Sequence, residues 1–274
     1  MSDRPKNYGD DPTTREDWER RFRSVDWTLL PNPALAPPYQ VAMDETLTLA
    51  TSKGTRGAHI RFWNWAGPCV VLGRFQSVQN EVHEDVAAEQ GVELVRRISG
   101  GGAMLIEPEG AITYSIVAPE SLVEGMSFAE SYEFFDSWII DALRELGVDA
   151  WYVPLNDLTS TGGKLGGAAQ ARKGGAVLHH TTMAYSMTPG RLVQILRIGK
   201  EKLSDKGITS AAKRVGPLRD QTELDRDVII QHMIGHFQSR YSLTEDDYTP
   251  EELEDLEERV KTKFATRDWI YFLP

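Results

Sequence analysis

Three consecutive glycines, Gly100–Gly102, restrict the folding of this chain more than any other feature. Two arginines, Arg96 and Arg97, lead into them from an apolar segment, and residues 103–106 are apolar again. Each glycine costs backbone entropy on folding, so three in a row require a reason. One reason is a flexible hairpin turn between two strands. The other is a backbone whose N–H groups close around an anion such as phosphate, with an arginine supplying charge.

A second glycine-rich stretch, residues 156–180, places Lys164 among glycines and alanines. A turn at 161–163 is expected to deliver Lys164 onto a strand of small residues, and a turn at 173–175 returns the chain into residues 176–187. The small neighbours leave a trough with an ammonium group at its floor. Such a point charge with three donors can hold a carboxylate and a phosphate together. The alternative is an ordinary exposed lysine of a hairpin.

Together these stretches resemble the lipoate-protein ligase A family, within the larger group of biotin ligases, lipoate ligases and octanoyltransferases. The matching segments, in the family's order and spacing, are residues 96–103, 156–158, 164–170 and 179–180, within a similarity that covers most of residues 40–196. Each short motif alone is a weak signal, but several in the same order are specific. The resemblance implies a catalytic domain of the class II synthetase and biotin-ligase type.

The resemblance also implies a two-step reaction. The carboxylate of lipoic or octanoic acid would attack the α-phosphate of ATP with the help of Mg²⁺, and a lysine of a lipoyl-acceptor protein would then attack the acyl-adenylate. The acceptor would be of the 2-oxoacid dehydrogenase E2 or glycine cleavage H protein type. Lys164 is suited to hold the carboxylate against the phosphate and to stabilise charge on the bridging oxygen. The expected function is therefore an ATP-dependent lipoate-protein ligase.

Carried over position by position, the resemblance assigns residues to roles. The nucleotide-binding positions are Arg97, Ser99, Gly100, Gly101, Gly102, Ala103, Met104, Leu105, Asn156, Asp157, Lys164 and His180. The substrate-binding positions are Arg74, Gly166, Gly167 and Ala168, and Asp157 is also the candidate metal ligand. His180 matches the pocket wall, where a structural and a contact role both stay open. Arg74 matches a turn beside the acyl pocket, for which a plain hairpin turn is the alternative.

An eight-carbon acyl chain requires an apolar tunnel. At about 0.8 kcal/mol per buried CH₂, its burial contributes roughly 5 kcal/mol, against the ~8 kcal/mol of micromolar binding. The candidate lining residues are Trp63, Trp65, Val71, Leu72 and the glycines near Lys164.

Three features depart from the ligase pattern. Ile106 and Glu107 stand where ligases usually have His-Asp, Thr181 replaces a usual glycine, and residues 113–115 are closer to the octanoyltransferase branch. An octanoyl or lipoyl transferase acting without ATP is therefore the alternative function, and a non-catalytic lipoate-binding protein is a third. A biotin ligase is disfavoured because its Gly-Arg-Gly-Arg signature is missing.

A transferase that forms an acyl-thioester needs a cysteine. No cysteine lies within residues 149–170, and the single cysteine of the chain is Cys69. Cys69 starts an apolar segment, which favours a small buried hydrophobe. A transferase that used Cys69 would instead be acylated there.

Composition limits the remaining classes. With 41 acidic and 30 basic residues the formal net charge is −11, which argues against general nucleic-acid binding. The sequence has no apolar run long enough for a membrane helix and no signal peptide at its start, and one cysteine excludes an intrachain disulfide. We therefore expect a cytoplasmic protein without membrane or nucleic-acid partners.

Residue patterns predict one α/β domain, a mixed and mostly antiparallel sheet flanked by helices. Residues 1–38 are expected to form an N-terminal extension, with an extended connection at 31–38, and residues 39–274 the catalytic domain with C-terminal helices. We expect no accessory domain in this chain. If the reaction needs one, a separate polypeptide would have to supply it. The expected helices span 40–51, 81–90, 128–146, 189–196, 225–241 and 250–264. A basic loop at 200–217 resembles a segment of the family, which implies that it closes over the adenylate or meets the acceptor; a merely solvated loop is the alternative.

Overall fold

A nine-stranded sheet forms the centre of the protein in the computed structural model, which describes residues 4–197 and 215–273. Its spatial order is β12 (Leu243–Glu245), β1 (Trp27–Leu30), β3 (Ala58–Trp65), β7 (Ala111–Pro119), β11 (Ala176–Ala184), β10 (Gly163–Lys173), β9 (Asp157–Ser160) and β8 (Ala150–Val153), while β2 (Ala34–Leu35) pairs with β3. All pairings from β3 through to β8 are antiparallel, whereas β1 and β2 pair in parallel with β3. This confirms the predicted fold class.

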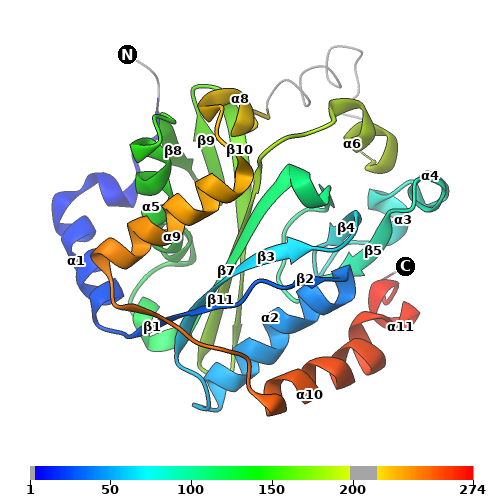
Figure 1. Cartoon of the computed structure of the whole chain (residues 1–274), viewed down its shortest axis with the longest axis horizontal. Helices are drawn as coiled ribbons and strands as arrows, with labels where there is room; N and C mark the ends of the chain where they lie inside the picture. The colour runs from blue at the N-terminus through cyan, green and yellow to red at the C-terminus, as the bar shows by residue number, and fades with distance from the viewer. Residues whose placement is uncertain (1–3, 198–214, 274) are drawn as a thin grey trace.

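A smaller sheet of three strands lies beside the large one (Figure 1). It consists of β5 (Glu93–Arg96), β4 (Cys69–Leu72) and β6 (Met104–Ile106), with β4 at the centre, parallel to β5 and antiparallel to β6. The glycine run connects β5 to β6, which lie on opposite sides of β4 and do not pair with each other. The alternative of a hairpin turn between two paired strands was therefore wrong. Short helices pack on this sheet: α3 (Val78–Glu81), α4 (Glu84–Glu89) and α6 (Pro189–Ile195).

One face of the large sheet is covered by α1 (Pro12–Arg23), α5 (Phe128–Glu145) and α9 (Arg226–Arg240), which Figure 1 shows together on one side. Helix α5 begins where Ser127 accepts a hydrogen bond from the Glu130 N–H, and Gly147 follows its end with φ +82°. Its aromatic stripe packs into the core, as predicted for residues 128–146.

The opposite face carries α2 (Pro37–Ser52) and α10 (Pro250–Arg259), the latter continued by a π-helical turn at Val260–Phe264. The described chain also contains α8 (Arg219–Thr222), α11 (Arg267–Ile270) and 3₁₀ turns at Tyr8–Asp10, Pro108–Gly110 and Glu120–Val123. None of the helices within the described ranges is both long and apolar enough to span a membrane.

The prediction of one helix over residues 81–90 was wrong. The chain forms α3 and α4 with a break at Val82 and His83, where Val82 bridges to Leu196 and the His83 N–H donates to the Ile195 carbonyl at 2.9 Å. Pairing with the end of α6 thus uses backbone groups that a continuous helix would bond internally. Such a distant partner is invisible in local periodicity.

The prolines at 31–38 also behave differently from the expected extended connection. Pro37 and Pro38 open α2, because the first helical turn has no use for the missing N–H. Residues 1–38 were expected to be an extension outside the domain, but their helix α1 and strand β1 are part of its packed core. Trp18 and Phe22 of α1 are 1% and 0% exposed, and β1 lies inside the sheet.

Candidate functional site

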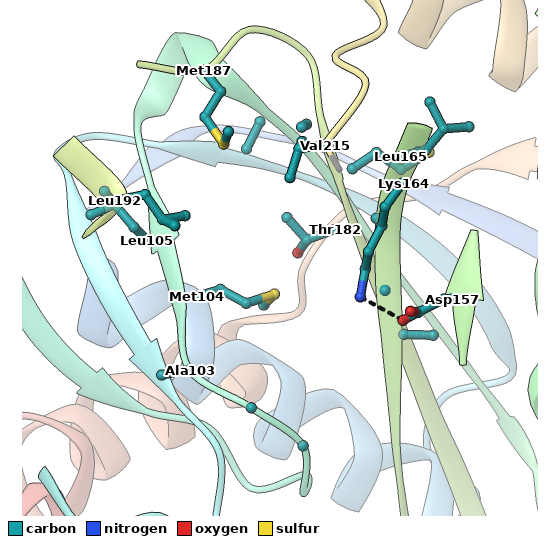
Figure 2. A pocket seen from close by; sticks show the side chains of 18 of the residues that line it. Ala103, Met104, Leu105, Asp157, Lys164, Leu165, Thr182, Met187, Leu192 and Val215 are labelled. Carbon is teal, nitrogen blue, oxygen red and sulfur yellow. Dashed lines mark hydrogen bonds and ion pairs between the residues drawn. The ribbon is translucent and has the colours of Figure 1, made fainter. Parts of the chain in front are cut away.

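A cavity of about 470 Å³ lies between the large sheet, the small sheet and α6. Residues of β10 and β11 form one wall, the glycine loop and β6 form another, and α6 with Val215 completes the lining. Figure 2 shows Lys164 and Asp157 on one side, facing Met104, Leu105 and Leu192 on the other. The two glycine-rich stretches of the sequence therefore meet across one cleft, as predicted.

Lys164 provides a cation at this cleft. Its Nζ lies 2.7 Å from Asp157 Oδ1, in an ion pair whose side chains are 46% and 35% exposed. The Gly216 N–H donates a hydrogen bond to the Lys164 carbonyl. Strand β10 also pairs with β9, and the register of this pairing shifts between Lys164 and Gly166. A Cβ at Gly166 would lie 2.1 Å from the Thr182 carbonyl oxygen, so this strand needs glycine to approach β11.

The remaining lining is mostly apolar. Its larger members are Met104, Leu105, Leu165, Met183, Met187, Leu192, Leu196 and Val215. The expectation that Trp63, Trp65, Val71 and Leu72 line the acyl tunnel was wrong, since all four pack in the hydrophobic clusters behind it. The sequence identifies these residues as large and apolar, but it does not show to which side of β3 and β4 their side chains point.

The glycine loop is held from within by Arg97. Its guanidinium donates to the carbonyls of Gly100 at 2.6 Å, Gly102 at 3.0 Å and Val71 at 3.2 Å. Burial lowers the pKa of Arg97 to about 10, so the group stays charged at neutral pH. Gly101 and Gly102 line the cavity, and their N–H groups donate no hydrogen bond to any described part of the chain. Beside the cavity the loop thus keeps two N–H groups for a ligand, while the carbonyls of Gly100 and Gly102 are bound by Arg97.

Arg96 and Arg74 do not have the roles expected of them. Arg96 is 0% exposed and donates to the carbonyls of Gly73, Gln76 and Ile270, so it fixes a turn and the C-terminal segment rather than an anion. The Arg74 guanidinium lies 4.4 Å above the Trp269 ring, away from the cavity lining. The predicted substrate contact of Arg74 is therefore not seen.

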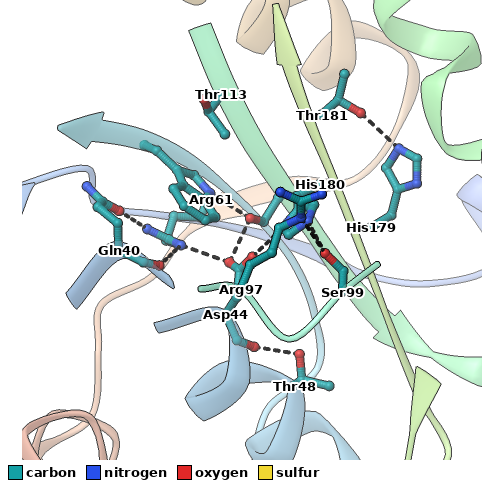
Figure 3. Close-up of polar contacts among 12 residues, drawn as sticks. Gln40, Asp44, Thr48, Arg61, Arg97, Ser99, Thr113, His179, His180 and Thr181 are labelled. Atoms are coloured by element: carbon teal, nitrogen blue, oxygen red, sulfur yellow. Dashed lines mark hydrogen bonds and ion pairs between the residues drawn. The ribbon is translucent and has the colours of Figure 1, made fainter. Parts of the chain in front are cut away.

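A buried polar chain approaches the glycine loop from α2 (Figure 3). Asp44 Oδ2 lies 2.7 Å from His180 Nδ1, and His180 Nε2 lies 2.6 Å from Ser99 Oγ. Burial lowers the pKa of His180, although Asp44 opposes this shift. Burial alone would raise the pKa of Asp44, but the hydrogen bond from His180 and the charge of Arg61 outweigh it and hold that pKa below its usual range. His180 is thus neutral at physiological pH.

Most predicted site residues line the cavity. They are Arg97, Gly101, Gly102, Ala103, Met104, Leu105, Asn156, Asp157, Lys164, Gly166, Gly167, Ala168 and His180. Their ligand contacts stay predictions. Ser99 and Gly100 do not reach the lining, and Ser99 is 1% exposed. Except for residues 215–217, the predicted basic loop at 200–217 lies outside the described residues.

Sequence reasoning missed the contribution of α6 and Glu107. Glu107 lines the cavity and its Oε1 lies 2.9 Å from Arg191 Nη1, which ties the end of β6 to α6. Leu192 and Leu196 also line the cavity. Their spacing of four residues is typical of one face of a helix, so the sequence could have indicated that they lie on the same side.

The residues present suit a phosphate or a carbonyl oxygen, because loop N–H groups and the Lys164 ammonium share the cavity. For Mg²⁺, no described group of three or more His, Cys, Asp or Glu residues is placed to hold a metal. A single carboxylate such as Asp157 is still compatible with an ion whose other ligands are phosphate and water oxygens. Cys69 is 0% exposed and burial raises the pKa of its thiol, which confirms the prediction of a buried hydrophobe.

Comparison with known proteins agrees with this geometry. The chain is 27% identical to the octanoyltransferase LipM of Moorella thermoacetica, over 89% of this chain and 97% of the relative. It is 29% identical to the lipoate-protein ligase LplJ of Bacillus subtilis, over 74% of this chain and 62% of that protein. The fold matches a bipartite lipoate protein ligase from Thermoplasma acidophilum with a TM-score of 0.79 and 26% identity, covering 91% of this chain and 98% of that structure.

The family model for the lipoyl protein ligase A/B catalytic domain matches residues 36–238. That range contains both glycine-rich stretches and nearly all of the cavity lining. This chain therefore belongs to the lipoyl protein ligase A/B catalytic domain family.

Proposed function

We propose that this protein transfers an octanoyl or lipoyl group to a lysine of a lipoyl-acceptor protein. The observation that carries the proposal is the cavity in which an apolar wall ends at the Lys164 ammonium and the loop N–H groups. The apolar wall suits an eight-carbon chain, whose burial contributes roughly 5 kcal/mol. Attack of the acceptor amine on the acyl carbonyl places negative charge on the carbonyl oxygen, which Lys164 and the N–H groups of Gly101 and Gly102 are suited to stabilise.

The first candidate donor is an acyl group that is already activated, such as an octanoyl thioester on a carrier protein, so that no ATP is needed. It is supported by the octanoyltransferases, which match this chain over nearly their whole length. Cys69 is too buried to act as the nucleophile. The acyl group would therefore pass directly from the donor sulfur to the acceptor nitrogen: the C–N bond forms, the C–S bond breaks, and the leaving thiolate takes up the proton that the amine loses.

The second candidate is ATP-dependent ligation, with Mg²⁺ at Asp157 and the nucleotide at Arg97 and residues 101–105. One specific observation favours it: none of the cavity-lining residues is a cysteine, so a transferase that forms an acyl-enzyme intermediate would have no nucleophile here. Activation by ATP requires no such nucleophile, because the acyl-adenylate itself is attacked by the acceptor amine. Similarity to a bipartite ligase makes a separate accessory polypeptide part of this candidate.

The test incubates purified protein with an apo lipoyl domain and three donors in parallel: octanoyl-carrier thioester without ATP, octanoate with Mg-ATP, and lipoate with Mg-ATP. Intact mass of the acceptor reports the transfer, and exchange of pyrophosphate into ATP reports adenylation. We expect acceptor modification, in the thioester arm for the first candidate or with exchange for the second. An unmodified acceptor in every arm, with no pyrophosphate exchange even after the accessory polypeptide of a bipartite ligase is added, together with retained lipoate binding, would instead identify the non-catalytic binding protein.

A further inference from the structure

The chain from α2 to the glycine loop has defined donors and acceptors throughout. Asp44 Oδ1 accepts from Arg61 Nη2 at 2.8 Å and from Ser115 Oγ at 2.7 Å. An ionised carboxylate can accept but not donate, so the proton between Asp44 and His180 belongs to His180 Nδ1. The neutral ring therefore has an unprotonated Nε2, which accepts from the Ser99 hydroxyl.

Ser99 is also bound from its other side. Its Oγ accepts from Arg97 Nε at 3.1 Å, so the hydroxyl both donates and accepts within the protein. Ser99 is 1% exposed and is absent from the cavity lining, which argues against a role as acyl nucleophile despite the Ser-His-Asp arrangement. Immediately after Ser99, the chain enters the loop whose Gly101 and Gly102 line the cavity.

We infer that Ser99 and His180 are positioning residues that hold the glycine loop in the shape required for acyl transfer. His180 fixes Ser99 at the start of the loop, and Arg97 fixes the carbonyls of Gly100 and Gly102. With both sets of contacts made, the loop N–H groups are kept for the acyl carbonyl. This inference rests on the proposed function, since it assigns these residues to that same cavity.

Two replacements of His180 separate its two contacts. The amide of His180→Asn stands where Nδ1 was and keeps a donor for Asp44 but loses Ser99, whereas the longer His180→Gln places an amide oxygen near the former Nε2. The matched control is His179→Asn, which alters an equally buried neighbour on the opposite face of β11. Acyl transfer is measured with whichever donor the wild-type protein uses, alongside the melting temperature.

We expect Ser99→Ala and His180→Asn to lower kcat by about 10- to 100-fold, because small displacements of catalytic donors have effects of this size. KM for the acyl donor should change less than about threefold, since the apolar wall is untouched. His180→Gln should recover part of kcat, and His179→Asn should lower the melting temperature while kcat stays near wild type. Wild-type kcat in Ser99→Ala, or an equal loss in His179→Asn, overturns the inference.

Nitrogen chemical shifts of histidine in ¹⁵N-labelled protein test the geometry without any activity. We expect His180 as the neutral Nδ1–H tautomer, with an Nε2 signal that shifts in Ser99→Ala. A protonated ring or an Nε2–H tautomer at pH 7 overturns the positioning role even if acyl transfer is found. A wild-type protein that shows the expected tautomer but modifies no acceptor instead refutes the proposed function alone.

Discussion

Two adjacent histidines of β11 do different work because a strand presents neighbouring side chains to opposite faces. His179 faces α5, where its Nε2 lies 2.8 Å from Asp136 Oδ1, and His180 faces α2 and the glycine loop. Both are neighbours in sequence and both are buried. The two networks differ in what they contact at their far ends: the His179 network reaches a core helix, α5, and the His180 network reaches the cavity loop.

The network around His179 and Asp136 lies on the core side of β11. Tyr114 Oη and Thr181 Oγ1 both donate to Asp136 Oδ1 at 2.6 Å, and Gln170 Nε2 lies 3.1 Å from His179 Nδ1. Its partners come from β7, β10, β11 and α5, so it ties the sheet to a helix. We therefore expect changes on this face to reduce stability, and changes on the cavity face to reduce transfer.

The largest effect should come from the cavity cation. Lys164→Ala removes the ammonium from the developing negative charge and should lower kcat by about 10²- to 10³-fold, the range found when one such group is lost. The free energy of unfolding should change little, because the Lys164–Asp157 pair is partly exposed.

Lys173→Ala is the matched control for that variant. Lys173 lies on the same strand with 48% exposure, but it pairs with Glu45 and does not line the cavity. Transfer to an apo lipoyl domain is followed by intact mass for both variants. Comparable losses in the two would contradict the assignment of Lys164 as the group that contacts the substrate.

Asp136→Ala should produce the largest loss of stability. It removes the acceptor that Tyr114, Thr181 and His179 share in a fully buried place. Each buried polar group left without a partner costs about 1–3 kcal/mol, so the total loss should be about 3 kcal/mol or more. Urea unfolding measures the change, and kcat is compared at a temperature where the variant is folded. A folded variant with kcat reduced tenfold would show that the two faces are not independent.

A smaller effect is expected from the two glycines of the loop that line the cavity. Gly101 has φ +92°, and a Cβ there would lie 2.8 Å from Arg97 Nη2, whereas a Cβ at Gly102 meets nothing within 4 Å. Gly101→Ala should therefore reduce the free energy of unfolding by about 1–2 kcal/mol. Gly102→Ala should have almost no effect on unfolding, and its effect on KM then reports contact with the acyl donor. Equal stabilities for the two variants would contradict this loop geometry.

The sequence predicted the parts of this arrangement that depend on local pattern. The helix over residues 128–146 follows from spacing and composition, whereas the meeting of Lys164 with the glycine loop followed from the resemblance to the lipoate-protein ligase A family. Contacts between distant residues did not follow. Asp44 and His180 are separated by 136 positions, and nothing in either neighbourhood marks the other as its partner. The contacts of Arg97 with the carbonyls of Gly100 and Gly102 did not follow from the sequence for the same reason, and only the fold shows them.

The smallest expected effect is a dependence of stability on pH that belongs to the cavity face. The pKa of His180 is lower in the folded protein than its usual value of 6.5, so between these two values the unfolded chain binds more protons. Stability from this group is therefore complete above about pH 6.5 and declines as the pH falls toward the folded pKa. His180→Gln has no proton to gain and should lose less stability than wild type between pH 7 and pH 5.

A second buried histidine, His59, also makes stability depend on pH, and it does so equally in wild type and in His180→Gln. Burial lowers the pKa of His59 to about 4, so wild type and His180→Gln share its loss of stability on acidification, which also begins near pH 6.5. Urea unfolding at pH 7, 6 and 5 isolates the His180 part as the difference between the two slopes. Parallel slopes would mean that His180 has the same proton affinity folded and unfolded. The prediction that burial on the cavity face lowers the pKa of His180 would then have to be abandoned.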